Sequence, residues 1–164
     1  MKKIPLFCLT LLLLGVSTTL GQQTDHTFDY SADFSKFKTY KWLPIQTTGA
    51  IDNLTMEQIK TAIETALAQK GLKKTDADTA DLLIKYQSRE TIRDRIPIDP
   101  TPDDPTTITY HGDLTISMYT AANHHFVWGG TASKALDPNA NPEKRQKNLN
   151  KAVAKLMKNY PPRK

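Results

Sequence analysis

The chain has 164 residues, with 22 lysines and arginines against 17 aspartates and glutamates. This length fits a single domain, and the basic residues behind the net charge of +5 are too scattered to indicate a nucleic-acid-binding surface. The one cysteine, Cys8, lies inside the first apolar run, so the rest of the chain can have no disulfide, cysteine nucleophile or thiolate metal ligand.

Residues 1–21 have the pattern of a secretory signal peptide. Two lysines precede an apolar run over residues 4–16, and small polar residues follow as far as Gly21. The run has about a dozen residues, fewer than the ~20 that a membrane-spanning helix needs. We expect cleavage at or near Gly21. Residues 22–164 would then be exported as one domain without a transmembrane span. We expect this domain to be periplasmic or secreted, and peripheral attachment to the cell envelope is one form that this location can take.

Two short strands are expected at the start of this domain. Residues 27–30 alternate between polar and apolar side chains, and residues 38–43 alternate again, with Tyr40 and Trp42 on one face. Pro44 ends the second strand, because proline lacks the amide hydrogen that a sheet needs.

A helix is predicted next, since apolar residues recur at helical spacing over about four turns. Thr55 and Gln58 have the spacing of a capping box for its first turn. Gly71 can adopt the left-handed conformation that ends a helix. The polar residues 73–79 then have the character of a connector.

A long strand begins after Ala80, with Leu82, Ile84 and Tyr86 directed toward a core. Four prolines follow within residues 97–105, and they exclude this segment from the interior of a sheet. We therefore expect an exposed excursion between two strands at this point.

Residues 112–136 are expected to form the central hairpin of the domain, with a turn at residues 121–124. Apolar side chains alternate along the first strand from Leu114 to Met118. Gly112 is expected to bend or bulge this strand, since glycine often marks such irregularities.

The return strand of the hairpin carries aromatic and then small residues at alternating positions. Phe126 and Trp128 are expected on one face. Gly130 and Ala132 follow them, and their lack of bulk lets another backbone or helix approach closely.

A second helix is predicted from Pro142, capped by Asn141, and ending before Pro161. The order strand, strand, helix, strand, strand, strand, helix predicts an α+β fold. We expect a two-layer sandwich, with a mainly antiparallel sheet of about five strands and both helices packed on one face.

Several short motifs occur in an order that is typical of one bacterial family. They are Asp29-Tyr30, Asp33-Phe34, residues 38–42 (KTYKW), residues 80–84 (ADLLI), Gly112-Asp113-Leu114, residues 127–132 (VWGGTA) and Tyr160-Pro161-Pro162. In this series the chain resembles the domain of unknown function 4136, a family found on envelope lipoproteins. The resemblance covers nearly all of the exported part. It implies a bacterial envelope protein and no particular reaction, so no catalytic residue is carried over. The chain lacks the family's usual lipid-acceptor cysteine, which favours a periplasmic or secreted protein.

The histidines of the hairpin are the main candidates for a metal site. His124 and His125 lie at its turn, and His111 lies just before it in the sequence. Neighbouring residues of an extended chain point to opposite sides, whereas a zinc site needs three or four converging ligands. We therefore expect exposed turn residues without a bound metal or other cofactor. A small metal-dependent hydrolase that uses these histidines is the alternative.

Other chemistry-bearing residues fit known sites no better. Three aspartates of the proline-rich segment (Asp99, Asp103 and Asp104) lack the spacing of an EF-hand. Ser133 lacks the flanking glycines of a nucleophile elbow, and Gly129-Gly130 lacks the lysine and hydroxyl residue that end a phosphate-binding loop. The sequence therefore predicts no catalytic residue and a protein that is not an enzyme.

Aromatic side chains at alternating strand positions leave two interpretations open. Either they pack in the core, or they form a surface for a partner, made by Tyr40, Trp42, Tyr86 and Trp128, with Phe126 beside them. The leading hypothesis is an exported accessory or binding protein of the cell envelope, acting through its sheet surface and proline-rich segment. Its partner would be an envelope protein, a lipid or a glycan. A structural domain without a discrete ligand is the third interpretation.

Overall fold

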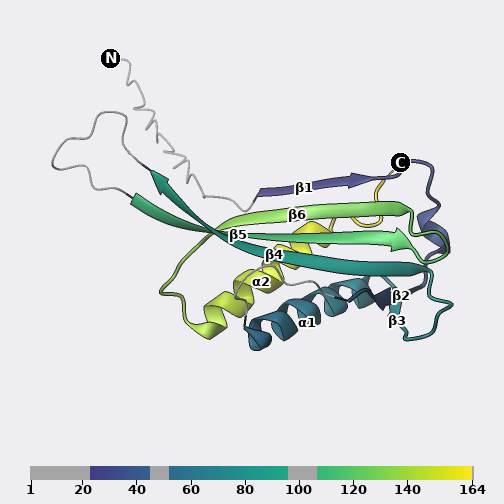
Figure 1. The fold of residues 1–164 in the computed structure, drawn as a ribbon, viewed down its shortest axis with the longest axis horizontal. Helices are drawn as coiled ribbons and strands as arrows, with labels where there is room; N and C mark the ends of the chain where they lie inside the picture. Colours follow the sequence, from purple (N-terminus) through teal and green to yellow (C-terminus); the bar gives the residue numbers. More distant parts are fainter. Residues whose placement is uncertain (1–22, 45–51, 96–106, 164) are drawn as a thin grey trace, which may run out of the picture.

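The computed structural model describes residues 23–44, 52–95 and 107–163 as an open six-stranded sheet with two long helices. Along the chain the elements are β1 (Gln23–Phe28), the 3-10 helix η1 (Phe34–Lys36), β2 (Thr39–Trp42), α1 (Asn53–Gln69), β3 (Lys73–Lys74), β4 (Leu82–Arg95), β5 (Thr107–Thr120), β6 (Phe126–Leu136) and α2 (Pro142–Met157). Both helices lie on the same side of the sheet and begin at the same end of it (Figure 1).

The strands follow the order β1-β6-β5-β4-β2-β3 across the sheet. Strands β1, β6, β5 and β4 pair antiparallel, whereas β2 pairs parallel with both β3 and β4. The predicted α+β class with two helices is confirmed. The sheet has one strand more than the number of about five that we expected, because the two-residue β3 is too short to show alternation.

The ends of the helices agree with the sequence patterns, except for the first cap. Asp52, not Thr55, is the N-cap of α1, and its carboxylate accepts a hydrogen bond from the Thr55 amide at 2.9 Å. Gly71 has φ of 82°, the left-handed conformation predicted for it. Asn141 caps α2 as predicted, because its side chain accepts a hydrogen bond from the Lys144 amide at 2.8 Å.

The hairpin of β5 and β6 differs from the prediction in one respect. The pairing runs through Gly112 without interruption, and the register shift lies between Met118 and Tyr119 instead. As a result, Phe126 does not share the face of Trp128. Its ring lies beside the Tyr119 ring, with centroids 5.9 Å apart, on the sheet face opposite the helices.

Two predicted segments, the signal peptide and the prolines of residues 97–105, lie outside the described residues. No helix in the described part of the chain is long and apolar enough to cross a membrane.

The core lies between the sheet and the two helices. Trp128 is fully buried, and its ring packs against the Tyr160 ring with centroids 5.6 Å apart. A Cβ on Gly130 would lie 2.6 Å from Leu156 Cδ1 of α2 and 3.2 Å from the carbonyl oxygen of Asp25. Helix α2 therefore packs so closely against β6 that a side chain at this position would displace Leu156.

A carboxylate joins the starts of β2 and β4. Asp81 Oδ2 accepts hydrogen bonds from the backbone amides of Lys38 and Thr39 and from the Thr39 hydroxyl, each 2.8 Å long. In return, the Asp81 amide donates to Thr39 Oγ1 at 3.1 Å. These reciprocal bonds fix the register of the parallel pair, in which Tyr40 lies opposite Leu82. The amide of Lys38, more than the other donors, lowers the pKa of Asp81.

Replacement of Gly130 by alanine is expected to lower the free energy of unfolding by about 1–3 kcal/mol, because the added methyl group overpacks a site that buried Leu156 already fills. Chemical denaturation measures this loss. Gly112→Ala is the matched control, since it stiffens the unfolded chain to the same extent. Its methyl group would lie 3.1 Å from the end of the flexible Leu136 side chain. An equal loss in both variants would contradict the close approach at Gly130.

Asp81→Asn is expected to lower stability at neutral pH and to lose this effect in acid. The folded-state pKa of Asp81 is lowered, so the carboxylate contributes stability above its ordinary pKa of 3.8 and loses that contribution as the pH falls below it. Urea denaturation of both proteins from pH 7 to pH 2.5 should show the difference shrinking below about pH 4. A difference that stays constant over this range would contradict the role of the charged carboxylate. Thr39→Val, which removes the reciprocal hydroxyl, should lower stability by about 1 kcal/mol at pH 7.

Candidate functional site

The core is not filled at the end of the sheet where both helices begin. An open cavity of about 400 Å³ lies there, between the N-terminal halves of α1 and α2 and the helix-facing side of β4, β5 and β6. Its apolar lining includes Ile59, Leu114, Ala132, Leu149 and Ala152. Volumes of about 300–1,000 Å³ are typical of pockets for small molecules. The cavity is therefore the strongest candidate site in the described part of the chain.

The sizes of the side chains along β6 explain why the cavity is at this end. On the helix-facing side, Trp128 fills the opposite end of the core, Gly130 receives Leu156 of α2, and Ala132 follows. Only a methyl group projects from β6 at Ala132, and Ala152 of α2 also lines the space. Small residues on both elements leave a volume that neither the strand nor the helix fills.

Charged side chains occur at the outer end of this cavity. Glu90 of β4, Gly112 of β5 and Lys134 of β6 lie opposite one another in a single row across three strands. By the alternation of strand residues, both charged side chains project to the helix-facing side, where both line the cavity. Leu136 leans over Gly112, so the floor between the two charges is apolar.

Two of the other charged residues that line the cavity, Arg145 and Asp137, have partners within the protein. The Arg145 guanidinium donates hydrogen bonds to the carbonyl oxygens of Ala140 and Pro138, at 2.9 and 3.1 Å. The Lys144 ammonium lies 2.8 Å from Asp137 Oδ2, and together with the Asn139 amide it lowers the pKa of Asp137. By contrast, among the described residues neither Glu90 nor Lys134 forms a hydrogen bond or an ion pair.

The aromatic residues do not form the partner surface that was one of the two interpretations. Tyr40, Tyr86 and Trp128 are at most 3% exposed, because their rings face the two helices. Burial, together with the Glu64 carboxylate, raises the pKa of Tyr40 to about 12. Trp42 is half-buried, and its Nε1 donates to Glu64 Oε1 at 2.8 Å. The interpretation as a surface is wrong for the three buried rings, and these residues belong to the core.

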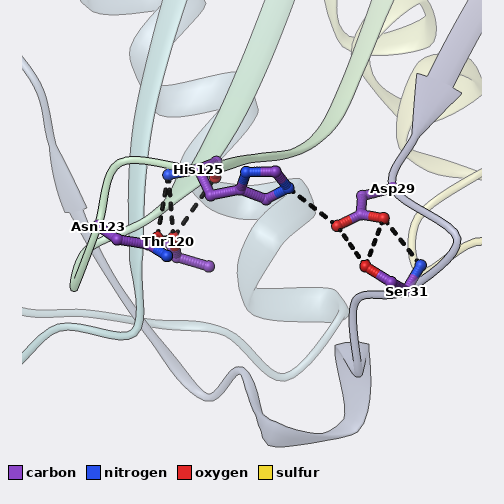
Figure 2. Close-up of polar contacts among 5 residues, drawn as sticks. All are labelled: Asp29, Ser31, Thr120, Asn123 and His125. Atoms are coloured by element: carbon purple, nitrogen blue, oxygen red, sulfur yellow. Dashed lines mark hydrogen bonds and ion pairs between the residues drawn. The ribbon is translucent and has the colours of Figure 1, made fainter.

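Figure 2 shows a polar cluster at the other end of the molecule, where the β5–β6 turn meets the end of β1. Asp29 Oδ1 accepts hydrogen bonds from the amide and the hydroxyl of Ser31, both 2.8 Å long, and Asp29 Oδ2 lies 3.0 Å from His125 Nε2. The Ser31 amide, followed by its hydroxyl, lowers the pKa of Asp29. The His125 amide donates to Thr120 Oγ1 and Asn123 Oδ1 at 3.1 Å each, which closes the turn.

This cluster contains the residue types of a serine hydrolase, but their spatial arrangement differs from that of the catalytic triad. In such enzymes the imidazole lies between the hydroxyl and the carboxylate and removes the hydroxyl proton. Here the Asp29 carboxylate lies between Ser31 and His125, so the imidazole is not in contact with the hydroxyl. The contacts instead tie β1 to the hairpin, which is a structural role.

The three candidate histidines are not brought together. His111 lies within β5, opposite Ala135 of β6, whereas His124 and His125 are exposed at the far end of this strand. Within the described ranges, no group of three or more histidine, cysteine, aspartate or glutamate side chains could hold a metal ion. The geometry therefore offers no support for the metal-dependent alternative.

Sequence comparison identifies the family to which this fold belongs. A family model described as "Domain of unknown function (DUF4136)" matches residues 24–162. The chain belongs to this family. The resemblance inferred from the sequence motifs is thereby confirmed. No curated protein matches the sequence.

Solved structures of the same fold include a second member of the DUF4136 family. A DUF4136 family protein from Bacteroides thetaiotaomicron matches with a TM-score of 0.57 and 14% identity, over 85% of this chain and 96% of that one. A PDZ domain protein from Parabacteroides distasonis has a TM-score of 0.56 and 18% identity; 89% of this chain is covered, but only 38% of that chain. The PelC dodecamer from Paraburkholderia phytofirmans has a TM-score of 0.54 and 10% identity, over 84% of this chain and 95% of that one. At these identities the similarity shows a common fold alone.

The motifs of the sequence do not single out the cavity or its two charged residues. One signal was present in β4, where the core-facing positions that hold Leu82, Ile84 and Tyr86 continue with Ser88 and Glu90. Polar residues at the core-facing positions of a strand indicate either that the core ends there or that a binding site begins there. The sequence alone could not distinguish these two cases, because the helices that enclose the cavity are distant in the chain.

Ser31 is expected not to react with a fluorophosphonate probe, because no imidazole is placed to accept its proton. Intact-mass spectrometry of the treated protein, with Ser31→Ala as the control, measures this. Labelling of Ser31 that disappears in a His125→Ala variant would show that the two residues do form a catalytic pair.

Proposed function

We propose that this DUF4136 protein is an exported, non-catalytic binding protein of the cell envelope, which holds a small ligand in the cavity between its helices and sheet. The observation that carries this proposal is the cavity itself. Its volume of about 400 Å³ lies within a well-packed domain, and its lining is mainly apolar with a few polar groups at one end. Sites for small molecules commonly have this combination.

The remainder of the described core supports the idea that the cavity has a function. Its side chains are tightly packed, so that even one added methyl group at Gly130 would clash with Leu156. Interiors normally contain few voids larger than a water molecule, because each void forfeits dispersion contacts. A ligand with an apolar part would restore the missing contacts.

Two further considerations support binding without catalysis. The cluster of Asp29, Ser31 and His125 has hydroxyl, carboxylate and imidazole groups but not the order needed for proton transfer. Export rests on the signal-peptide pattern of residues 1–21. A role in the envelope also accords with the resemblance described above.

The test is binding of a neutral fluorescent apolar probe, 1-N-phenylnaphthylamine, to the protein without its first 21 residues. We expect saturable binding to one site. Ala152→Trp should weaken this binding by about tenfold or more, because the indole occupies the cavity. Ala154→Trp is the matched control, since Ala154 is two residues away on α2 and exposed. Equal binding by all three proteins, each shown by circular dichroism to be folded, would contradict the proposed site.

A further inference from the structure

We infer that the ligand of this cavity is a single-chain amphiphile whose polar end carries both an anionic and a cationic group. Lys134 would bind the anion, Glu90 would bind the cation, and the apolar chain would lie between α1, α2 and the sheet. This inference rests on the proposed function and extends it by naming the class of ligand.

The first argument is the placement of the two charges. Glu90 and Lys134 lie in one row of the sheet, with β5 between them. Strands two positions apart are separated by about 10 Å, twice the usual strand spacing of ~4.8 Å. Both side chains line the same cavity, and they approach its outer end from opposite sides. A ligand group placed between them would meet a carboxylate on one side and an ammonium on the other.

The second argument is that the protein does not pair these charges. The position between them is Gly112, which offers no polar side chain, and Leu136 covers it with its methyl groups. In the described part of the chain, no ion pair or hydrogen bond satisfies either Glu90 or Lys134, whereas nearby Asp137 is paired with Lys144. Opposite charges that face one apolar floor without meeting are complementary to a zwitterion.

The third argument concerns the apolar part of the ligand. The inner lining is formed by aliphatic side chains, and two of them, Leu114 and Ala132, are at most 6% exposed. A pocket of about 400 Å³ lies within the range of sites for small organic molecules, so it has room for an alkyl chain. The ligand chemistry is therefore that of a lysophospholipid with an ethanolamine headgroup.

Displacement of 1-N-phenylnaphthylamine by four amphiphiles of equal chain length tests this inference. The zwitterion is lysophosphatidylethanolamine, and the others are anionic lysophosphatidylglycerol, a neutral monoacylglycerol and a cationic alkyltrimethylammonium, each below its micellar concentration. The zwitterion should bind about tenfold tighter than the anionic lipid and more tightly still than the neutral one, since each charged contact contributes about a factor of ten. Each methylene removed from the chain should weaken binding about fourfold. Phosphoethanolamine without a chain should not displace the probe at millimolar concentration.

The variants separate the two contacts. Lys134→Gln should weaken binding of the zwitterion and of the anionic lipid about tenfold and leave binding of the neutral lipid unchanged. Glu90→Gln should weaken binding of the zwitterion alone, so that the variant binds the zwitterion no more tightly than the anionic lipid. The exchange variant Glu90→Lys with Lys134→Glu should recover part of the preference for the zwitterion. Lys85→Gln, on the opposite sheet face beside the Tyr119 ring, is the control and should change nothing.

Two outcomes would overturn this inference and differ in their consequence for the proposed function. If all four amphiphiles bind equally and neither charge variant has an effect, while Ala152→Trp still blocks binding, the cavity is a ligand site without zwitterion recognition. If Ala152→Trp also leaves all probes unaffected, the proposed function fails as well. Equal affinity for the zwitterionic and anionic lipids would assign a role to Lys134 but remove the role of Glu90.

Discussion

The close contact between α2 and β6 at Gly130 determines how the rest of the domain is arranged. A side chain on Gly130 would meet both Leu156 and the backbone of β1, so this strand position is enclosed from the helix side and from its neighbouring strand. Trp128, one position further on the same face, fills the core beneath Tyr160. Because Leu156 of α2 is held tightly against Gly130, the space beside this contact is set by the next small residues, Ala132 of β6 and Ala152 of α2. Contact and cavity therefore both depend on small side chains where α2 faces β6.

The two ends of the domain differ in whether charged side chains have hydrogen-bond or ion-pair partners within the protein. At the end opposite the cavity, Asp81 and Asp29 each accept several hydrogen bonds, which lower their pKa values. Asp81 joins β2 to β4, and Asp29 joins the end of β1 to the β5–β6 turn through His125. At the open end, Glu90 and Lys134 face the cavity without a partner among the described residues. Glu90 is exposed and Lys134 is half-buried, so water solvates both in the free protein. Held apart above an apolar floor, the two charges have a geometry suited to an external ligand.

Most of the fold could be predicted from the sequence, because both helices and the strands β4, β5 and β6 have clear periodicity and the caps at Gly71 and Asn141 are recognisable. The first strand was misplaced, since it was expected at residues 27–30 and β1 is Gln23–Phe28, a mostly polar segment that pairs with β6. The failures have local physical reasons. β3 has only two residues, and it is held by hydrogen bonds from the Lys73 and Thr75 amides to the carbonyl oxygens of Lys38 and Tyr40, which no local pattern predicts. The register shift lies between Met118 and Tyr119, not at Gly112, where the pairing is uninterrupted and the Leu136 side chain packs over the glycine. This shift also moved Phe126 to the opposite face.

The candidate site was less accessible to sequence reasoning, and the reason is instructive. The histidines and aromatic residues do not form this site, and Tyr40, Tyr86 and Trp128 follow the core interpretation, one of the two that the sequence left open. The cavity is defined instead by what is missing, namely bulk at Ala132 and Ala152 and a side chain at Gly112. Small residues indicate a cavity only when the positions of the elements that face them are known. Glu90 and Lys134 are far apart in the sequence and flank a glycine only through the register of three strands, so their joint role is a property of the sheet.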